Sequence, residues 1–293
     1  MSFLRRTPKP KLASGNEIER PRLDLSGPRL KQAFETLLTG SEELGGVENY
    51  VEALKLKSRL FQDAFLNNER DDVEVESFAA LCAFMASVRR RIGHYLDENR
   101  FSRIRAAVTE LLSSHEDTVN TDQRLAKFCA SFPDDKAHRW VRDLAAEILH
   151  NTYPERYPLM NRWVWDRKAN TGVIREIWFA DDIDHITINV ADGYGTFLML
   201  REELSQFLHD NGVFRDILYY NDLLCAQVYA DYVCAQGGSY LRADFASPDD
   251  PMQHVRRLLG LDGVKPRSGR TRVKAIDGEA YVIETNQPLL GNP

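Results

Sequence analysis

The sequence predicts a mainly helical protein with a smaller α+β part. Up to about residue 165, apolar residues recur at helical spacing. After Asp166, short runs rich in β-branched residues appear between further helical stretches. We therefore expect three parts: a flexible basic arm over residues 1–28, a helical domain over 29–166, and an α+β domain with helices and two short β-hairpins over 167–293.

The helices expected in the first half have start and stop signals. The stretch RLKQAFETLLTG predicts a helix that Gly40 stops. The stretch DDKAHRWVRDLAAEILH predicts a helix favoured by Asp134 and Asp135, because acidic side chains complement the dipole at a helix N-terminus. That helix must end before Pro154, since the residue preceding a proline avoids the α region. Further helices are expected in VENYVEALKLKSRLFQDAFLNNE, VESFAALCAFMASVRRRIGHYLDEN, RFSRIRAAVTELLSSH and NTDQRLAKFCASF.

The second half is expected to hold the two β-hairpins. The first would pair Val173–Phe179 with Ile186–Val190 across the turn-like stretch ADDID. The second would lie in RTRVKAIDGEAYVIET and turn at Asp277–Gly278. Two helices ending at glycines, and a short one with Pro251 in its first turn, are expected between the hairpins.

The composition excludes several classes of protein. Hydrophobic residues make up 43% of the chain and charged residues 28%, which is ordinary for a soluble globular protein. The net charge is −6, so any nucleic acid would have to bind at a local basic patch. The N-terminal stretch lacks the apolar core of a signal peptide, and no run approaches the ~20 apolar residues of a membrane span. We therefore expect a cytoplasmic protein with no membrane partner.

Familiar catalytic and cofactor motifs are missing from the sequence. The four cysteines form no C-x-x-C pair, which removes support for a zinc ribbon or a thioredoxin-like site. The chain has neither a phosphate-binding glycine loop nor a G-x-S-x-G nucleophile motif. The sequence accordingly predicts no cofactor and no catalytic residue.

Two basic segments are the candidate nucleic-acid-binding sites. The first is VRRRIGHYLDENRFSRIR, where arginines gather around a helix–helix junction that also holds His94 and Tyr95. The second runs from Arg256 to Lys274 and has seven Lys or Arg residues against one acid, Asp262. Basic side chains bind phosphates, but such segments are also common as solvated loops or as helix ends that complement the dipole. The predicted contact residues are Arg89, Arg90, Arg91, Arg256, Arg257, Lys265, Arg267, Arg270, Arg272 and Lys274; the first segment also carries Arg100, Arg103 and Arg105.

An acidic cluster offers an alternative site. Asp181, Asp182, Asp184 and His185 lie together in FADDIDHITINV. Carboxylates and imidazole suit Mg, Mn or Zn, so this cluster could serve a metal-dependent hydrolase or nuclease. The spacing matches no specific metal motif, and aspartates are also common in turns because they bond to nearby backbone groups.

The four tryptophans lie within 39 residues of one another, at positions 140, 163, 165 and 178. Aromatic side chains bury large apolar areas, so we expect this cluster to pack the two halves of the chain together. A platform on which bases stack is the alternative interpretation.

The stretch DLAAEILHNTYPERYPLMNRWV resembles a segment of helix-hairpin-helix DNA-glycosylase-like domains, which occur in repair and phage-defence proteins. The resemblance covers about residues 120–166. It implies a helical scaffold and places Asn161 where active glycosylases carry a catalytic aspartate. An amide cannot act as an anionic base, and SFPDDKAHRW lacks the glycine-rich hairpin that grips phosphate in the family. The resemblance therefore implies a scaffold that kept DNA contact but lost base excision.

Together these features predict a non-catalytic, nucleic-acid-associated accessory protein of a bacterial mobile element or phage-defence system. Two alternatives stay open. One is the metal-dependent hydrolase or nuclease, and the other is a structural adaptor subunit that docks another protein.

Overall fold

Helices dominate the computed structural model, which describes residues 18, 20–67, 73–180, 182–236, 251–262, 270–276 and 279–284. The helices are α1 (Gly27–Ser41), α2 (Val47–Gln62), α3 (Val75–Cys82), α4 (Glu98–Ser113), α5 (Thr121–Ala130), α6 (Trp140–Thr152), α7 (Val173–Glu176), α8 (Tyr194–Asp210), α9 (Ile217–Gln236) and α11 (Gln253–Leu258). Shorter helical turns are η1 (Glu42–Leu44), η2 (Asp63–Asn67), η4 (Gly93–Tyr95), η5 (Lys136–His138) and η6 (Ile183–His185).

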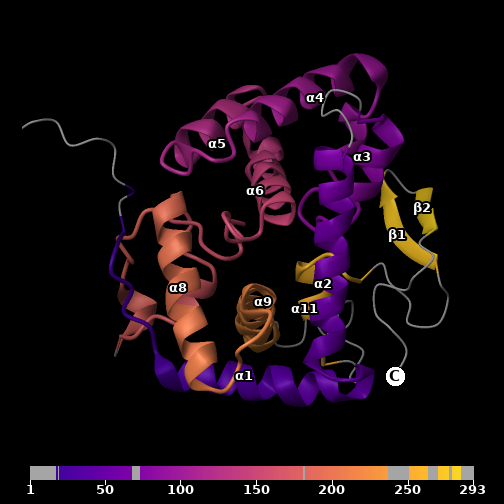
Figure 1. Cartoon of the computed structure of the whole chain (residues 1–293). Coiled ribbons are helices and arrows are strands. Elements are labelled where there is room, and N and C mark those ends of the chain that lie inside the picture. The colour runs from indigo at the N-terminus through magenta and orange to yellow at the C-terminus, as the bar shows by residue number, and fades with distance from the viewer. Residues whose placement is uncertain are drawn as a thin grey trace, which may run out of the picture.

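Helix α9 is the central element. Residues 221–228 are all buried, and α9 packs against α1, α2, α7, α8 and α11. A helix without a polar face is stable in water only when other elements cover it on every side. In Figure 1, α1 runs below α9, while α8 and α2 stand on its two sides.

Helix α6 is the second buried element. Every residue of α6 except Arg142 is buried, and the helix packs against α2, α4 and α5. In Figure 1, α4 and α5 close the upper end of the molecule above α6. A single hydrophobic core runs from Leu23 to Leu261, so residues before and after position 166 share it.

The tryptophans pack across this shared core, as the sequence predicts. Trp165 is fully buried, and its Nε1 donates a hydrogen bond to the carbonyl oxygen of Val190 at 3.1 Å. The ring of Trp163 lies 5.8 Å from the ring of Tyr229 on α9. Both contacts join the first part of the chain to the second.

The residues just before α1 also lie on the core. Leu23 is buried, and the backbone N–H of Ser26 donates to the carbonyl oxygen of Ile177 at 2.7 Å. Leu25 forms an isolated β-bridge with Trp178. Most of the basic segment that the sequence places in the arm, residues 1–17 and 19, lies outside the described residues.

The prediction that the second half of the chain forms an α+β domain is wrong. Where the first hairpin is expected, Val173–Glu176 forms the short helix α7 and Ile183–His185 forms a turn of 3₁₀ helix. Ile186 is extended, but residues 186–190 pair with no strand in the described part of the chain. The cause is packing: Val173, Ile174 and Ile177 are all buried, which is the spacing of a helical turn and not of an alternating strand.

The strands β1 (Arg270–Ile276) and β2 (Glu279–Glu284) form an isolated antiparallel pair. Their register aligns Arg270 with Glu284 and shifts between Val273 and Ile276. No other strand occurs among the residues described. Asp277 and Gly278, where the second hairpin is expected to turn, lie outside the described residues. The fold is therefore mainly helical, without the second, α+β half.

No helix in the part of the chain that the structure describes is long and apolar enough to cross a membrane.

Candidate functional site

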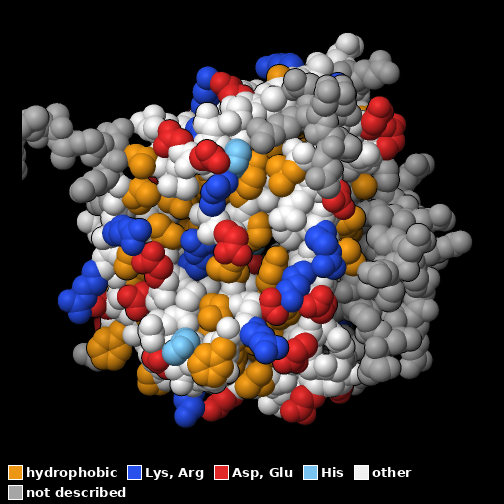
Figure 2. All heavy atoms as spheres, viewed as in Figure 1, with side chains coloured by type: hydrophobic (Ala, Val, Ile, Leu, Met, Phe, Trp, Pro, Cys, Tyr) orange, Lys and Arg blue, Asp and Glu red, His pale blue; other side chains and the backbone are white. Residues whose placement is uncertain are grey.

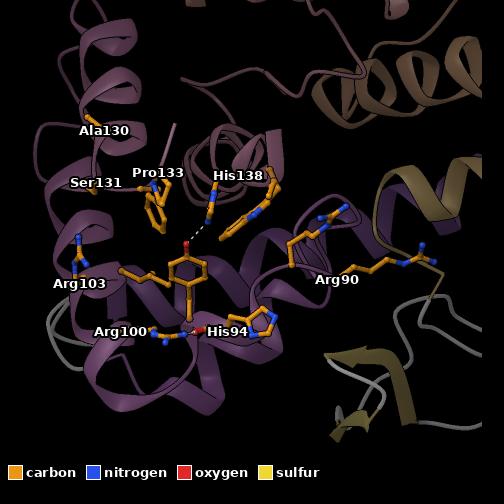
Figure 3. A pocket seen from close by; sticks show the side chains of 14 residues that line it. Arg90, His94, Arg100, Arg103, Ala130, Ser131, Pro133 and His138 are labelled. Carbon is orange, nitrogen blue, oxygen red and sulfur yellow. Dashed lines mark hydrogen bonds between the residues drawn. The ribbon is translucent and has the colours of Figure 1, made fainter. Parts of the chain in front are cut away.

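A pocket of about 850 Å³ opens between the segment after α3, the first turns of α4 and the loop that joins α5 to α6. We call it the arginine-lined pocket (Figure 3). Its lining residues are Arg90, Arg91, His94, Tyr95, Arg100, Arg103, Ile104, Ala130, Ser131, Phe132, Pro133, Ala137, His138 and Trp140. Arginines thus come from two separate elements, and aromatic rings lie between them.

The segment after α3 presents two arginines because its apolar residues are anchored. Val88 and Ile92 are fully buried, and the N–H of Ile92 donates to the carbonyl oxygen of Val88 at 3.1 Å. In such a helical turn, residues four apart share one face, the residue midway between them lies on the opposite face, and its two neighbours lie on the flanks. Arg90 on the opposite face and Arg91 on one flank are exposed, whereas Arg89 on the other flank is buried.

The start of α4 presents the other two arginines. Asp97 caps this helix, and its Oδ1 accepts a hydrogen bond from the backbone N–H of Arg100 at 2.9 Å. The Arg100 side chain is held by the carbonyl oxygen of His94 at 2.8 Å and by Asp97 Oδ2 at 3.4 Å. Arg103, one turn further on, is exposed. Figure 3 shows Arg100 and Arg103 on one side of the pocket and Arg90 on the other.

A hydrogen-bonded chain of three side chains crosses the pocket wall. Nδ1 of His138 lies 2.8 Å from Oδ1 of Asp135, and Nε2 lies 2.5 Å from the hydroxyl oxygen of Tyr95. The carboxylate can only accept, so in the neutral form of the ring the proton belongs on Nδ1, and Nε2 can then accept the Tyr95 O–H. In Figure 3, the dashed line at the labelled His138 marks its hydrogen bond to the hydroxyl.

Local structure explains the position of Asp135. Its Oδ1 accepts hydrogen bonds from the backbone N–H groups of Ala137 at 2.7 Å and His138 at 3.0 Å, which caps η5. The hydrogen bond from the His138 side chain, together with these two backbone donors, holds the pKa of Asp135 below its usual value of 3.8. The carboxylate is therefore ionised at neutral pH.

Three neighbouring rings hold the Tyr95 ring in place. Its centroid lies 5.5 Å from Phe132, 5.7 Å from Trp140 and 5.9 Å from His138, each in an edge-to-face arrangement. Edge-to-face pairs are the favoured geometry for aromatic rings and restrict rotation. The hydroxyl of Tyr95 is therefore positioned by packing as well as by its hydrogen bond.

Positive charge is concentrated at the pocket. Four arginines line it, while the carboxylates of Asp97 and Asp135 contact Arg100 and His138 but do not belong to the described lining. Arg257 on α11 lies close to Arg90. Burial and this neighbouring guanidinium lower the pKa of Arg257, while Asp262 raises it. On the face shown in Figure 2, by contrast, basic and acidic side chains are interspersed.

The structure brings the two predicted basic segments together. Arg89 is 2% exposed, and its two terminal nitrogens donate to the two carboxylate oxygens of Asp262 at 2.5 and 2.6 Å. Arg256 and Arg257 lie on α11, and Arg257 is close to this pair. Arg89 is therefore held in a buried ion pair and does not line the arginine-lined pocket.

The structure does not describe the side chains of the remaining predicted basic residues. Lys265 and Arg267 lie outside the described residues. Arg270, Arg272 and Lys274 lie on β1, and their side chains are outside what the structure describes.

The acidic cluster is only partly described. Nδ1 of His185 lies 2.7 Å from Oδ1 of Asp182, and both side chains are exposed on or beside η6. Asp181 lies outside the described residues, as does the side chain of Asp184. Within the described residues, no group of three or more His, Cys, Asp or Glu side chains could hold a metal ion.

Asn161, the residue singled out by the glycosylase resemblance, is closed inside the core. It is 1% exposed, and its Nδ2 donates to Glu147 Oε1 at 2.9 Å. The other oxygen of Glu147 pairs with the buried Lys57 at 2.9 Å. The amide of Asn161 can thus donate a hydrogen bond to the buried Glu147 carboxylate. An aspartate at position 161 could donate this hydrogen bond only in its protonated form.

Sequence reasoning missed Asp135, His138 and Phe132 as parts of the site. The D-x-x-H spacing of Asp135 and His138 is a local signal, since both residues lie on one short turn. Their link to Tyr95, which lies 43 residues away in the sequence, appears only in the folded chain.

No protein-family model, curated protein or solved structure matches this chain.

Proposed function

We propose that this chain binds single-stranded nucleic acid by holding its phosphates in the arginine-lined pocket. The observation that carries the proposal is the charge of the lining, with four arginines and no described carboxylate, in a chain whose net charge is −6. Guanidinium groups bind phosphate oxygens through two parallel hydrogen bonds, which suits them to this ligand. The resemblance of residues 120–166 to DNA-glycosylase-like domains points to the same class of ligand, and an accessory role in a bacterial mobile element or phage-defence system fits that class.

The shape of the site favours an unpaired strand. A volume of about 850 Å³ has the size of a pocket for a small ligand, and a duplex presents its phosphates on a convex surface that cannot enter such a pocket. Tyr95, Phe132 and Trp140 lie among the arginines. Proteins that bind single strands combine basic side chains for the backbone with aromatic rings for the exposed bases.

Fluorescence anisotropy tests this proposal. A labelled oligothymidylate and a duplex of the same length are titrated with wild type, with the double variant Arg91→Ala/Arg103→Ala, and with Arg59→Ala. Arg59 is a matched control because it is exposed on α2, outside the pocket.

We expect the wild type to prefer the single strand. The double variant should bind it about tenfold or more weakly, and Arg59→Ala should stay within about twofold of wild type. Absence of binding at low salt would overturn the proposal, and so would an equal loss in the control.

A further inference from the structure

We propose that Tyr95 is a nucleophile that attacks a phosphodiester of the bound strand and forms a phosphotyrosyl bond. This inference goes beyond strand binding and rests on it, because the phosphodiester must first enter the arginine-lined pocket. It also replaces the sequence-based expectation of a non-catalytic protein.

The chain Asp135–His138–Tyr95 has the arrangement of an activated nucleophile. A hydroxyl lies 2.5 Å from an imidazole nitrogen, and the other nitrogen lies 2.8 Å from a carboxylate. Hydroxyl nucleophiles in enzymes are activated by a base within hydrogen-bond reach, which a third group orients. A tyrosine needs this help, because its pKa near 10 leaves it protonated at neutral pH.

Comparison with other histidines of the molecule supports a role beyond packing. His150 pairs with Asp222 inside the core, while His185 and His209 pair with aspartates on the exposed surface. Of these histidine–aspartate pairs in the described part of the chain, the pair of His138 and Asp135 is joined to a hydroxyl at the wall of a pocket. The His138 side chain is 19% exposed, so ligand atoms can approach it.

The proposed step is a balanced transesterification. The Tyr95 oxygen forms a bond to phosphorus, and the bond from phosphorus to one ribose oxygen breaks. The Tyr95 proton passes to Nε2 of His138 and then to the leaving ribose oxygen, which becomes a hydroxyl. One phosphate ester replaces another, so the step needs no oxidant, reductant or further reactant.

The arginines supply what the reaction needs besides the nucleophile. Negative charge on the non-bridging oxygens increases as the fifth bond to phosphorus forms. Cationic donors stabilise such a transition state most effectively when they are positioned in advance. Arg100 is already held by the carbonyl oxygen of His94 and by Asp97, on the element that follows Tyr95.

The test is capture of the covalent adduct. A single-stranded oligonucleotide labelled with different dyes at its two ends is incubated with the full chain and resolved on a denaturing gel. Wild type should give a protein band that retains one dye, and mass spectrometry of its peptides should place the nucleotide on Tyr95.

Variants separate chemistry from binding and folding. Tyr95→Phe keeps the ring and should abolish the adduct, while anisotropy still detects binding of the oligonucleotide. His138→Gln should slow adduct formation about 100-fold or more at saturating oligonucleotide, the effect expected for loss of a general base. Asp135→Asn retains an oxygen that caps η5 and should also slow adduct formation, while loss of its charge tightens binding by no more than about two- to threefold. Slower chemistry without weaker binding identifies Asp135 as a positioning residue.

Two results would overturn this inference while leaving strand binding intact. One is an oligonucleotide that binds wild type but gives no adduct, and the other is an adduct that forms equally in Tyr95→Phe. Absence of any binding would overturn both proposals, so the two failures are distinguishable by anisotropy.

Discussion

Arg89 and Asp262 form a bidentate ion pair that joins the segment after α3 to the residues after α11. The guanidinium is almost fully buried, whereas the carboxylate is 20% exposed. This pair holds Arg257 near Arg90, although more than 160 residues separate them in the sequence. The pair therefore helps to build the basic surface without lining the arginine-lined pocket.

Replacing Asp262 with alanine should destabilise the protein. The change leaves the Arg89 charge buried without its partner, which costs about 3 kcal/mol in the free energy of unfolding. Urea denaturation of Asp262→Ala measures this loss. Asp182→Ala removes an exposed aspartate and should shift the free energy by no more than about 0.5 kcal/mol. Equal free energies for the two variants would show that the Arg89 pair is not structural.

Replacing Asp97 with serine should raise the affinity for an oligonucleotide. Serine also caps helices, so the free energy of unfolding should stay within about 0.5 kcal/mol of wild type. Loss of the carboxylate removes a negative charge that pairs with Arg100 at the pocket, so binding should tighten by about two- to threefold at low salt. Asp97→Ala should tighten binding equally but lower the free energy of unfolding by about 1 kcal/mol, because it loses the cap. Weaker binding in both variants would contradict a pocket that attracts phosphate.

The buried pair of His150 and Asp222 should make stability depend on pH. Burial alone lowers the pKa of His150, but the Asp222 carboxylate at 2.9 Å and the carbonyl oxygen of Tyr157 outweigh it and raise the pKa above 6.5. Because the folded-state pKa is raised, the stabilisation is fully present below about pH 6.5 and is lost as the pH rises through the folded-state value.

Urea denaturation across that pH range tests the pair. The free energy of unfolding of wild type should fall as the pH rises above 6.5. In Asp222→Asn the partner charge is gone, so this fall should disappear. An identical pH profile in the variant would assign the dependence to other groups.

Local signals in the sequence predict much of the helical architecture. The proline at position 154 correctly limits α6, which ends at Thr152. Gly40 is expected to stop the first helix, and α1 continues only to Ser41. These boundaries follow from backbone chemistry within a few residues, which a sequence displays directly.

Features set by tertiary packing are harder to predict. The β-branched run that begins at Val173 suggests a strand, yet it forms α7 because its apolar side chains lie against α9. The sequence shows directly that Arg90 and Arg91 are basic. It does not show the hydrogen bond between Tyr95 and His138, because this contact depends on how α4, α5 and α6 pack together.

The salt dependence of oligonucleotide binding tests the central claim most directly. For a single strand, the logarithm of the binding constant falls with the logarithm of salt concentration by about 0.7 for each phosphate that a cation neutralises. If each of the four arginines meets one phosphate, wild type should give a slope of about −2.8 and Arg91→Ala/Arg103→Ala about −1.4. The same slope in both proteins, or a slope of zero in wild type, would contradict phosphate binding in the arginine-lined pocket.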